Sequence, residues 1–388
     1  MYTRIALSIA ALAVPAVLLG PPAQADPRPS TPGSTVTLPL AGIEQEPDAD
    51  APRTGRTEVL TTERHTPAYS LLGVTWAGSG TGERVVVHVR TRTGGVWSPW
   101  RELHASHAGG DGGTGGGDVD RAGAGGRGGT EPFWAGPSDG IQIRVGVLEG
   151  VSPKDLRAEL VDPGESILDR MPPLPGLPKR TDGRAVKGHA IEPAIVARKD
   201  WGADESLRDA KFKYTNTVRA AFVHHTADGN DFSCSDSAKV LRSIYRYHVK
   251  TNGWADVGYN FLVDKCGTIF EGRAGGTDKP VLGAHTLGFN TDSMGVAAMG
   301  TYTKAQPPGP MLISLSRLLA WKLGLDDRDA KGKVTLTSSD GGSRYPKGTT
   351  HSFDVISGHR DAFNTECPGQ ALYDELGAIR RDVALRLG

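Results

Sequence analysis

The sequence predicts an α/β protein whose mixed central β-sheet is flanked by helices and preceded by a small all-β sandwich domain. At 388 residues, the chain is long enough for two domains. Its first half has period-two apolar alternation and no helical period, whereas its second half interleaves strands with amphipathic helices. Glycine (52) and proline (26) make up about a fifth of the chain, which indicates frequent breaks between elements.

The charge balance excludes some classes of partner. Lys+Arg and Asp+Glu each number 44, so the formal net charge is zero. A dedicated nucleic-acid binder would carry a basic surface, and an anionic membrane would also attract one. We therefore expect no nucleic-acid and no membrane partner.

The first residues indicate where the protein works. A short basic start precedes the apolar run 5–19, which Pro15 interrupts, and the small-x-small sequence Ala23-Gln24-Ala25 follows. This order is typical of a cleaved secretory signal, and the run is too short for a stable membrane span. We predict that residues 1–25 are removed and that the mature chain is secreted, either extracellular or associated with the cell wall.

Residues 26–165 are expected to form the first domain. Residues 26 to about 52 are rich in Pro, Thr and Asp and predict an extended lead-in. Apolar alternation at 85–92, 141–147 and 156–160 predicts strands of a small antiparallel β-sandwich over about 54–165. Between them, 12 of the 21 residues from Gly109 to Gly129 are glycine, which predicts a mobile loop.

A linker is expected at 166–193, followed by the second domain at 194–388. The run 171–178, MPPLPGLP, is stiff and extended by composition, so few contacts between the domains are expected.

The sequence pattern of the second domain predicts interleaved strands and helices. A helix capped by Ser235 or Asp236 is expected to end at Asn252–Gly253, and Pro368 is placed near the start of the last helix. The polar stretch 326–352 is expected to be a surface loop. The other elements are strands at 221–224, 259–263, 268–270 and 294–299, and helices marked by leucines at 312–323 and 372–387.

Three side chains in this domain suit a metal. The pair His224–His225 ends the first strand, His359 follows Gly358, and Cys367 comes eight residues later. Two histidines and a thiolate can bind zinc through N, N and S and leave a fourth position for water. Each piece alone is weak, because an isolated histidine near a strand usually has a structural role.

The residues between these anchors carry a family resemblance. The ordered runs are 254–263 (WADVGYNFLV), 267–273 (GTIFEGR), 283–286 (GAHT), 358–361 (GHRD) and 366–369 (ECPG). Over about residues 194–388 this set resembles the peptidoglycan recognition proteins, which share their fold with phage-lysozyme-type and bacterial type-2 N-acetylmuramoyl-L-alanine amidases. The resemblance implies a Zn2+ amidase that cuts between N-acetylmuramic acid and L-alanine. It also implies His224, His359 and Cys367 as the metal ligands.

The resemblance implies further roles. Tyr259 matches the family's donor to the oxyanion, although a buried core tyrosine is the competing interpretation. Thr365 stands where phage members have lysine, so we assign it an orienting or hydrogen-bonding role. The expected substrate-binding residues are His248, Trp254, His285 and Asn290. Residues 274–281 are longer than the corresponding segment of animal receptors, so stem-peptide specificity cannot be transferred.

Three cysteines leave one unpaired. In a secreted protein, Cys234 and Cys266 can form a disulfide between the start of the helix and the strand hairpin. The family resemblance supports this pairing, which leaves Cys367 for the metal. The other pairings would remove a metal ligand or leave a free extracellular thiol.

Two alternatives to the amidase stay open. One is a binding-only recognition module for peptidoglycan, although such members commonly lack a metal ligand and this chain keeps all three. The other is a cysteine hydrolase that uses Cys367, disfavoured because Pro-Gly follows the thiol instead of a strand-to-helix turn that presents a nucleophile. The expected partners are peptidoglycan and muramyl peptides, and the expected state is a monomer.

Overall fold

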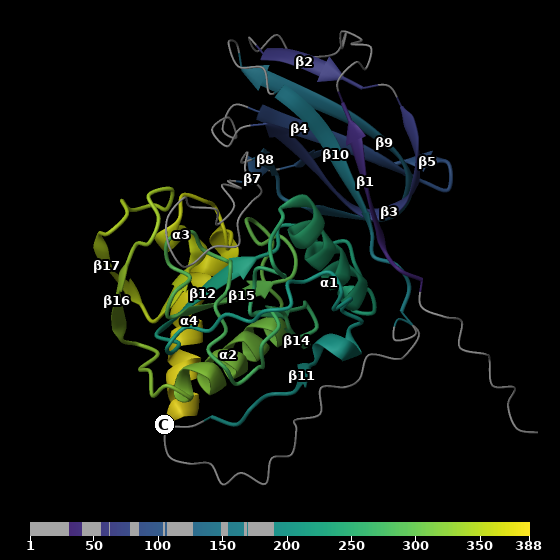
Figure 1. Cartoon of the computed structure of the whole chain (residues 1–388). Helices are drawn as coiled ribbons and strands as arrows, with labels where there is room; N and C mark the ends of the chain where they lie inside the picture. Colours follow the sequence, from purple (N-terminus) through teal and green to yellow (C-terminus); the bar gives the residue numbers. More distant parts are fainter. Residues whose placement is uncertain are drawn as a thin grey trace, which may run out of the picture.

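The computed structural model describes residues 31–40, 56–61, 63–77, 85–103, 105–106, 127–148, 154–166, 169 and 190–388. The predicted signal segment 1–25 lies outside these residues, as does most of the predicted linker 166–193. Figure 1 shows an all-β part next to a larger α/β part. Within the described ranges, no helix is long and apolar enough to cross a membrane.

The all-β part is a set of antiparallel strands joined by continuous pairing. Its main strand order is β1-β10-β3-β9-β4-β5, and four short strands pair at its margins. The strands are β1 (Ser34–Pro39), β2 (Arg56–Leu60), β3 (Arg64–Ala77), β4 (Val85–Thr93), β5 (Val96–Trp97), β6 (Arg101–Leu103), β7 (Ala105–Ser106), β8 (Arg127–Thr130), β9 (Phe133–Leu148) and β10 (Lys154–Asp162).

Apolar alternation correctly located β4, β9 and β10, whereas β3, which lies between β9 and β10 in the sheet, was not predicted. In β4, Val85, Val87 and Val89 are buried while the intervening side chains are half-exposed. These side chains pack with Ile143 of β9 and Leu160 of β10 in one apolar core. The all-β class predicted for this region is therefore confirmed.

Two details of this region differ from expectation. Part of the supposed lead-in is strand β1, which pairs with β10 over its whole length from Ser34 to Pro39. The end of the glycine-rich run is strand β8, whose Gly128 and Gly129 pair with β3. In both cases hydrogen bonds to the backbone of a distant strand form the element, so side-chain alternation gives no signal.

The α/β part is built on a six-stranded mixed sheet. Its order is β11-β14-β13-β15-β12-β18, in which only the β13–β14 pair is antiparallel. Its strands are β11 (Ile195–Val196), β12 (Ala220–His225), β13 (Phe261–Val263), β14 (Ile269–Glu271), β15 (Ser293–Ala298) and β18 (Ile356–Gly358), and its helices are α1 (Ser237–Arg246), α2 (Gly309–Gly324), α3 (His359–Ala362) and α4 (Gln370–Leu387).

Helices cover both faces of this sheet. Val296 of β15 packs with Leu319 of α2 and Leu376 of α4, whereas its neighbour Ala297 packs with Ile244 of α1. Successive residues of a strand point to opposite faces, so α1 lies on one face and α2 and α4 lie on the other. Figure 1 shows this layering, which confirms the predicted mixed sheet flanked by helices.

The stretch expected to be a surface loop at 326–352 contains an ordered strand. Strand β16 (Lys333–Thr337) pairs antiparallel with β17 (Thr350–Asp354) as a separate two-stranded sheet. Val334 and Leu336 are buried against Phe353 in the main core. The surface-loop prediction was wrong because these few apolar residues alternate within a polar stretch.

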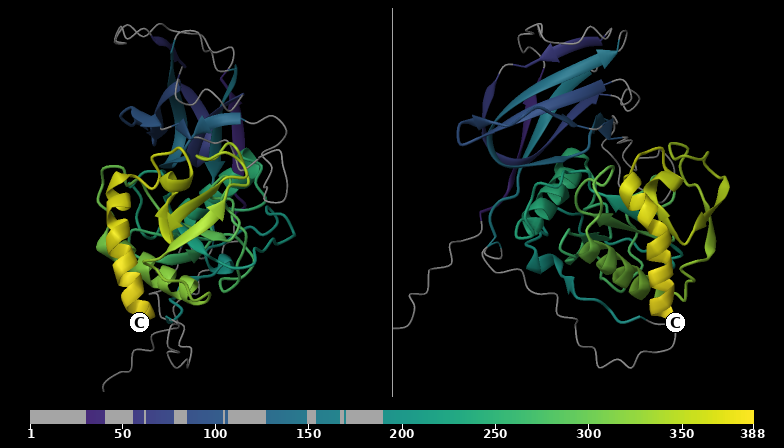
Figure 2. Two further views of the ribbon diagram at one scale, coloured as in Figure 1. Left: turned by 90° about the vertical axis from the view of Figure 1, so that its left-hand side faces the viewer. Right: turned by 180° about the vertical axis from the view of Figure 1, so that it is seen from behind.

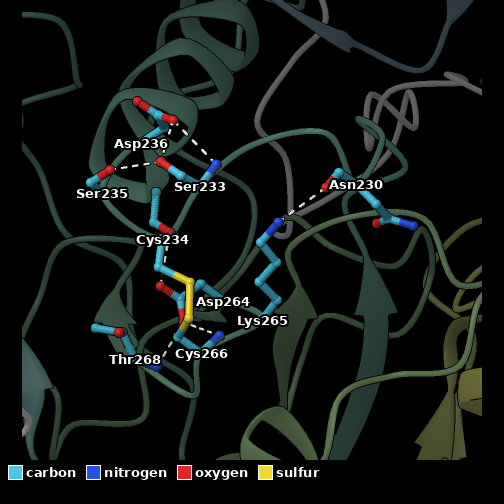
Figure 3. The surroundings of a disulfide bond; sticks show 10 residues. Asn230, Ser233, Cys234, Ser235, Asp236, Asp264, Lys265, Cys266 and Thr268 are labelled. Atoms are coloured by element: carbon cyan, nitrogen blue, oxygen red, sulfur yellow. Dashed lines mark hydrogen bonds between the residues drawn. A yellow bond between two sulfur atoms is a disulfide. The ribbon is translucent and has the colours of Figure 1, made fainter.

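The predicted disulfide between Cys234 and Cys266 is present, with 6.2 Å between the Cα atoms. Figure 3 shows it joining the segment before α1 to the turn between β13 and β14. The carboxylate of Asp264 supports this turn by accepting hydrogen bonds from the backbone N–H groups of Cys266 (3.0 Å) and Thr268 (2.8 Å). Cys367 is free and buried.

The two parts meet over α1, as the views in Figures 1 and 2 show. Leu71, Trp134 and Val161 of the all-β part belong to the same apolar cluster as Leu241 and Ile244 of α1. Nε of Arg242 in α1 also donates to the carbonyl of Pro163 (3.4 Å), next to the end of β10. The expectation of few contacts between the domains was therefore wrong, because it considered the linker and not the faces that the linker joins.

Candidate metal centre and groove

The sheet brings two histidines together at the carboxyl ends of neighbouring strands. Strands β12 and β18 run parallel, with Val223 opposite Gly358. The next residues along the two strands, His224 and His359, therefore emerge side by side, with ring centroids 4.4 Å apart. This edge of a parallel sheet is where α/β proteins commonly place their sites.

Cys367 completes a compact group with these histidines. Its Sγ lies 3.8 Å from Nδ1 of His224. One potential ligand atom from each of His224, His359 and Cys367 falls within 4.8 Å of the other two. His224 and Cys367 are buried, and His359 is half-buried. The structure thus brings together the three residues predicted as ligands.

Burial sets the protonation of this group. It lowers the pKa of His224 well below its ordinary value, and any positive charge on His359 adds to this effect. His224 is therefore neutral and able to donate a lone pair. Burial also raises the pKa of the Cys367 thiol, an effect that the backbone N–H of His225 opposes and the carboxylate of Glu131 reinforces. A thiol at this position loses its proton when a cation binds.

The donor set fits zinc. Two imidazole nitrogens and one sulfur form a set that zinc accepts, and three protein ligands are the usual number where a fourth position serves chemistry. The backbone N–H of His225 donates to Sγ of Cys367 (3.3 Å), and Oγ1 of Thr365 accepts from the N–H of Cys367 (3.1 Å). These bonds orient the thiol, as outer contacts commonly do around metals.

His285 contacts His224, the first predicted ligand, on the side away from Cys367. Its Nδ1 lies 3.2 Å from Nε2 of His224, within hydrogen-bonding distance, so that Nδ1 of His224 remains for the metal. Its ring fits because two neighbours are glycines: a Cβ at Gly295 would lie 2.3 Å from the ring's Cγ, and one at Gly283 would lie 2.6 Å from its Cδ2. The contacts of His285 are thus those of a residue that positions His224.

Asn290 is also enclosed. Only 2% of the residue is exposed, and its Oδ1 accepts hydrogen bonds from the backbone N–H groups of His285 and Thr286, both at 2.9 Å. These contacts hold the turn that carries His285. A substrate contact of Asn290 stays a prediction that these internal contacts do not favour.

The remaining predicted residues form an aromatic group beside His224. The ring of Tyr259 lies 5.3 Å from that of His224 and 5.7 Å from that of His248, and Trp254 lies 4.5 Å from His248. Tyr259 and Trp254 are half-buried. Nδ1 of His248 accepts the N–H of Gly258 (3.2 Å), and burial lowers the pKa of His248 to about 3, so its ring is neutral.

A lysine of α2 hydrogen-bonds to the longer segment at 274–281. Nζ of Lys322 donates to the carbonyls of Thr277 (2.9 Å) and Lys279 (3.1 Å). Burial lowers the pKa of Lys322 to about 8. No motif in the sequence marks this lysine, because its partners are backbone carbonyls far along the chain.

Two family models match the chain, one over each part. The family model described as N-acetylmuramoyl-L-alanine amidase matches residues 214–370. Another, described as Rv3811 N-terminal galactose-binding domain-like, matches residues 22–163. The chain therefore has two parts, a galactose-binding-like all-β part and, after it, a domain that matches the amidase family model.

The chain is similar to individual proteins over about half of its length. Peptidoglycan-recognition protein SC2 of Drosophila melanogaster is 31% identical over 185 residues, which cover 47% of this chain and 84% of that protein. The human N-acetylmuramoyl-L-alanine amidase is 33% identical over 187 residues, covering 47% of this chain and 28% of that protein. Among solved structures, wild-type Drosophila PGRP-LB is 26% identical with a TM-score of 0.38, covering 47% of this chain and 92% of that one. The chain belongs to the peptidoglycan recognition protein and type-2 amidase family.

Proposed function

We propose that this protein is a secreted, zinc-dependent N-acetylmuramoyl-L-alanine amidase that hydrolyses the bond between N-acetylmuramic acid and L-alanine in peptidoglycan. The observation that carries the proposal is the complete His224, His359 and Cys367 group, with Tyr259 beside its first ligand. Binding-only members of the family commonly lack one of these ligands. The relative from human that bears the amidase name supports the same reaction.

The ligands would hold zinc through two imidazoles and a thiolate. When bound, zinc supplies a Lewis acid that activates a water molecule and polarises a carbonyl oxygen. The protein itself would orient the ligands. His285 fixes the ring of His224 by a contact between its own Nδ1 and Nε2 of His224. Thr365 and the N–H of His225 fix the thiolate of Cys367.

Tyr259 is the residue proposed to act on the substrate. Its hydroxyl would donate a hydrogen bond to the oxygen of the scissile carbonyl as negative charge develops there. A tyrosine suits this role because it donates while neutral, and its side chain is half-buried, next to His224. His248 and Trp254, whose rings lie next to each other beside it, would hold the muramyl peptide against the site.

The proposed organisation of the mature protein follows the sequence. Residues 1–25 would be removed on secretion, residues 26–165 would form the all-β domain and residues 166–193 the linker. Residues 194–388 would carry the reaction. The protein would act as a monomer on the wall outside the cell membrane.

The test is digestion of purified peptidoglycan with the full-length protein, in zinc-loaded and chelator-treated forms, followed by mass spectrometry of the products. Free stem peptides that begin with L-alanine, together with intact lactyl-bearing sugars, are expected only from the zinc-loaded form. Binding without release would identify a recognition module. Cleavage that persists in chelator would identify a hydrolase that uses the thiol.

A further inference from the structure

A large cleft opens between the two parts of the protein on the Cys367 side of the metal centre. Its volume is about 1000 Å³, at the upper end of the range for ligand sites. The α/β wall includes Cys367, Thr365 and His225, and the all-β wall includes Glu102 and Glu131. The aromatic group of His248, Trp254 and Tyr259 is not part of this lining. The cleft is thus a second surface that extends away from the candidate metal centre.

The wall from the all-β part is fixed next to the metal ligands. Three residues after Glu131, the backbone N–H of Trp134 donates to the carbonyl of Asp228 (2.9 Å). Asp228 lies in the turn that follows His224 and His225. Gly229 in the same turn takes a positive φ of 92°, and a Cβ there would lie 3.3 Å from the ring of Phe133. These contacts join the segment of Glu131 to the end of β12.

The wider interface adds rigidity to this arrangement. Arg101, adjacent to Glu102, pairs with Asp231 at 2.9 Å. Gly73 of β3 faces the ring of Tyr247, where a Cβ would lie only 2.4 Å from the phenol oxygen. Because apolar side chains of both parts share one cluster, the wall does not depend on the linker for its position.

The side chains that line the cleft indicate which kind of ligand it can bind. Both charge signs, amides and hydroxyls are present, and apolar side chains are few. The polar members from the α/β part include Arg344, Arg360, Asn364, Thr301, Thr303 and Gln370. Nη1 of Arg344 already donates to the carbonyl of Arg360 (2.7 Å), and Nη1 of Arg360 donates to Gln370 (2.8 Å). Such a mixed surface suits a neutral chain with many hydroxyl and amide groups better than an ion of one sign.

The geometry points to a sugar-chain subsite that the all-β domain completes. Glu102 and Glu131 accept hydrogen bonds from the hydroxyl and acetamido groups of the glycan on the sugar side of the cleaved bond. The stem peptide, which carries carboxylates and an amine, then lies toward Tyr259 and Trp254. The inference rests on the proposed amidase function, since it assigns which half of that substrate each domain holds. It makes the protein selective for polymeric wall over small muramyl peptides.

Carboxylate-to-amide variants of the full-length protein test this subsite. Glu102→Gln and Glu131→Gln keep the side-chain shape and remove the charge. Glu63→Gln is the matched control, because Glu63 lies in the same domain, pairs with Arg90 at 2.7 Å and is outside the cleft lining. The measured quantity is kcat/KM for glycan chains of several disaccharides divided by kcat/KM for a single muramyl peptide.

The proposal expects this ratio to fall about tenfold in each cleft variant, mainly through a higher KM for the chains, and to stay at the wild-type value in Glu63→Gln. An unchanged ratio in both cleft variants would overturn it. A loss that follows stem length rather than the number of sugars would also overturn it, because the occupant would then be the peptide.

A binding measurement separates this inference from the amidase proposal. Peptide-free glycan strands are titrated into chelator-treated wild type, Glu102→Gln and Glu63→Gln. The inference expects about tenfold weaker binding for Glu102→Gln only, whether or not the wild type cleaves peptidoglycan. Equal binding by all three proteins would contradict it. A wild type that binds strands but never cleaves would count against the amidase proposal alone.

Discussion

Oγ1 of Thr365 accepts a hydrogen bond from the backbone N–H of Cys367 at 3.1 Å, so the hydroxyl two residues before the thiol fixes the thiol's backbone. The same side chain lines the interdomain cleft. Thr365 therefore has both a structural contact to a proposed ligand and access to a bound substrate.

Thr365→Val removes this acceptor and keeps the branched shape. We expect zinc affinity or turnover to fall by roughly 10–100-fold, the usual effect of losing an outer contact of a metal ligand. Thr365→Ser keeps the acceptor and should restore most of the loss. Zinc competition with a fluorescent chelator and amidase kinetics measure both effects. A serine variant as damaged as the valine variant would argue against the hydrogen-bonding role.

Cys367→Ser should abolish both zinc retention and amide cleavage while leaving some muropeptide binding. The thiolate is a charged, soft ligand, whereas a serine hydroxyl stays protonated at neutral pH and binds zinc poorly. Metal analysis after dialysis and a binding titration measure the outcome.

The matched control is His225→Asn, next to the proposed ligand His224. Nδ1 of His225 accepts the N–H of Tyr302 (3.2 Å), a contact that the asparagine oxygen can reproduce. This variant should retain zinc. If it loses zinc while His224→Ala keeps it, the first ligand has been assigned to the wrong histidine.

Tyr259→Phe should keep zinc and lose turnover by about 10²-fold, as expected for removal of one oxyanion donor. The loss should appear in kcat. Tyr214→Phe is a suitable control, because Tyr214 is 51% exposed and its hydroxyl donates to the carbonyl of Gly275. Equal rates in both variants would favour the core-aromatic interpretation of Tyr259.

The disulfide between Cys234 and Cys266 closes a loop with a sequence separation of 32 residues. In the chain-entropy model, such a cross-link stabilises the fold by about 3–4 kcal/mol. The double variant Cys234→Ala with Cys266→Ala should therefore unfold at lower denaturant concentration, and reducing agent should lower the stability of the wild type only. An identical midpoint in the two proteins would mean that the link stabilises nothing.

Asp228 should give the protein a specific pH dependence. Burial raises the pKa of its carboxyl to about 6, although the hydroxyl of Thr226 donates to it at 2.6 Å. The folded protein then holds this proton more tightly than the unfolded chain, whose aspartate titrates near 4. Stability conferred by the protonated form is thus present below about pH 4 and is lost as the pH rises to 6.

The measurement is the unfolding temperature of wild type and Asp228→Asn between pH 4 and 8. The wild type should lose stability relative to the variant across pH 4–6, by on the order of 1–3 kcal/mol. Parallel curves for the two proteins would show that Asp228 does not titrate in this range.

The ligand group was predicted from the family resemblance, and the apolar pattern of β12 correctly placed His224 near the end of a strand. Val223 precedes His224 in the fully buried strand β12, whereas β18, which ends at Gly358 just before His359, was not predicted as a strand. What could not be predicted is that these two strands are neighbours, because β12 pairs with β18 across more than 100 residues of chain. Local patterns carry no information about such pairing.

Hydrogen bonds that involve backbone groups could not be predicted from the sequence either. Asn290 was predicted to bind substrate because it matches a groove position of the family, but its oxygen accepts two backbone N–H groups inside the fold. Glu131 followed a glycine-rich run that predicted mobility, yet the N–H of Trp134 anchors the next few residues to Asp228. Hydrogen bonds between distant backbone groups leave no trace in residue type.

The contact between Gly73 and Tyr247 offers a way to couple docking of the two domains to ligand binding. Tyr247 packs on the all-β part, and the ring of the next residue, His248, lies 4.5 Å from that of Trp254 beside the metal centre. The helical turn Tyr247–Thr251 therefore contacts both the all-β part and the aromatic group beside the metal centre. Suppose that docking of the two domains holds this turn in the conformation that binds ligand and so raises the affinity for ligand by some factor. Thermodynamic linkage then requires that a ligand bound beside Trp254 strengthen the docking by the same factor. A protein held in this way would couple the all-β part and the candidate site through one equilibrium.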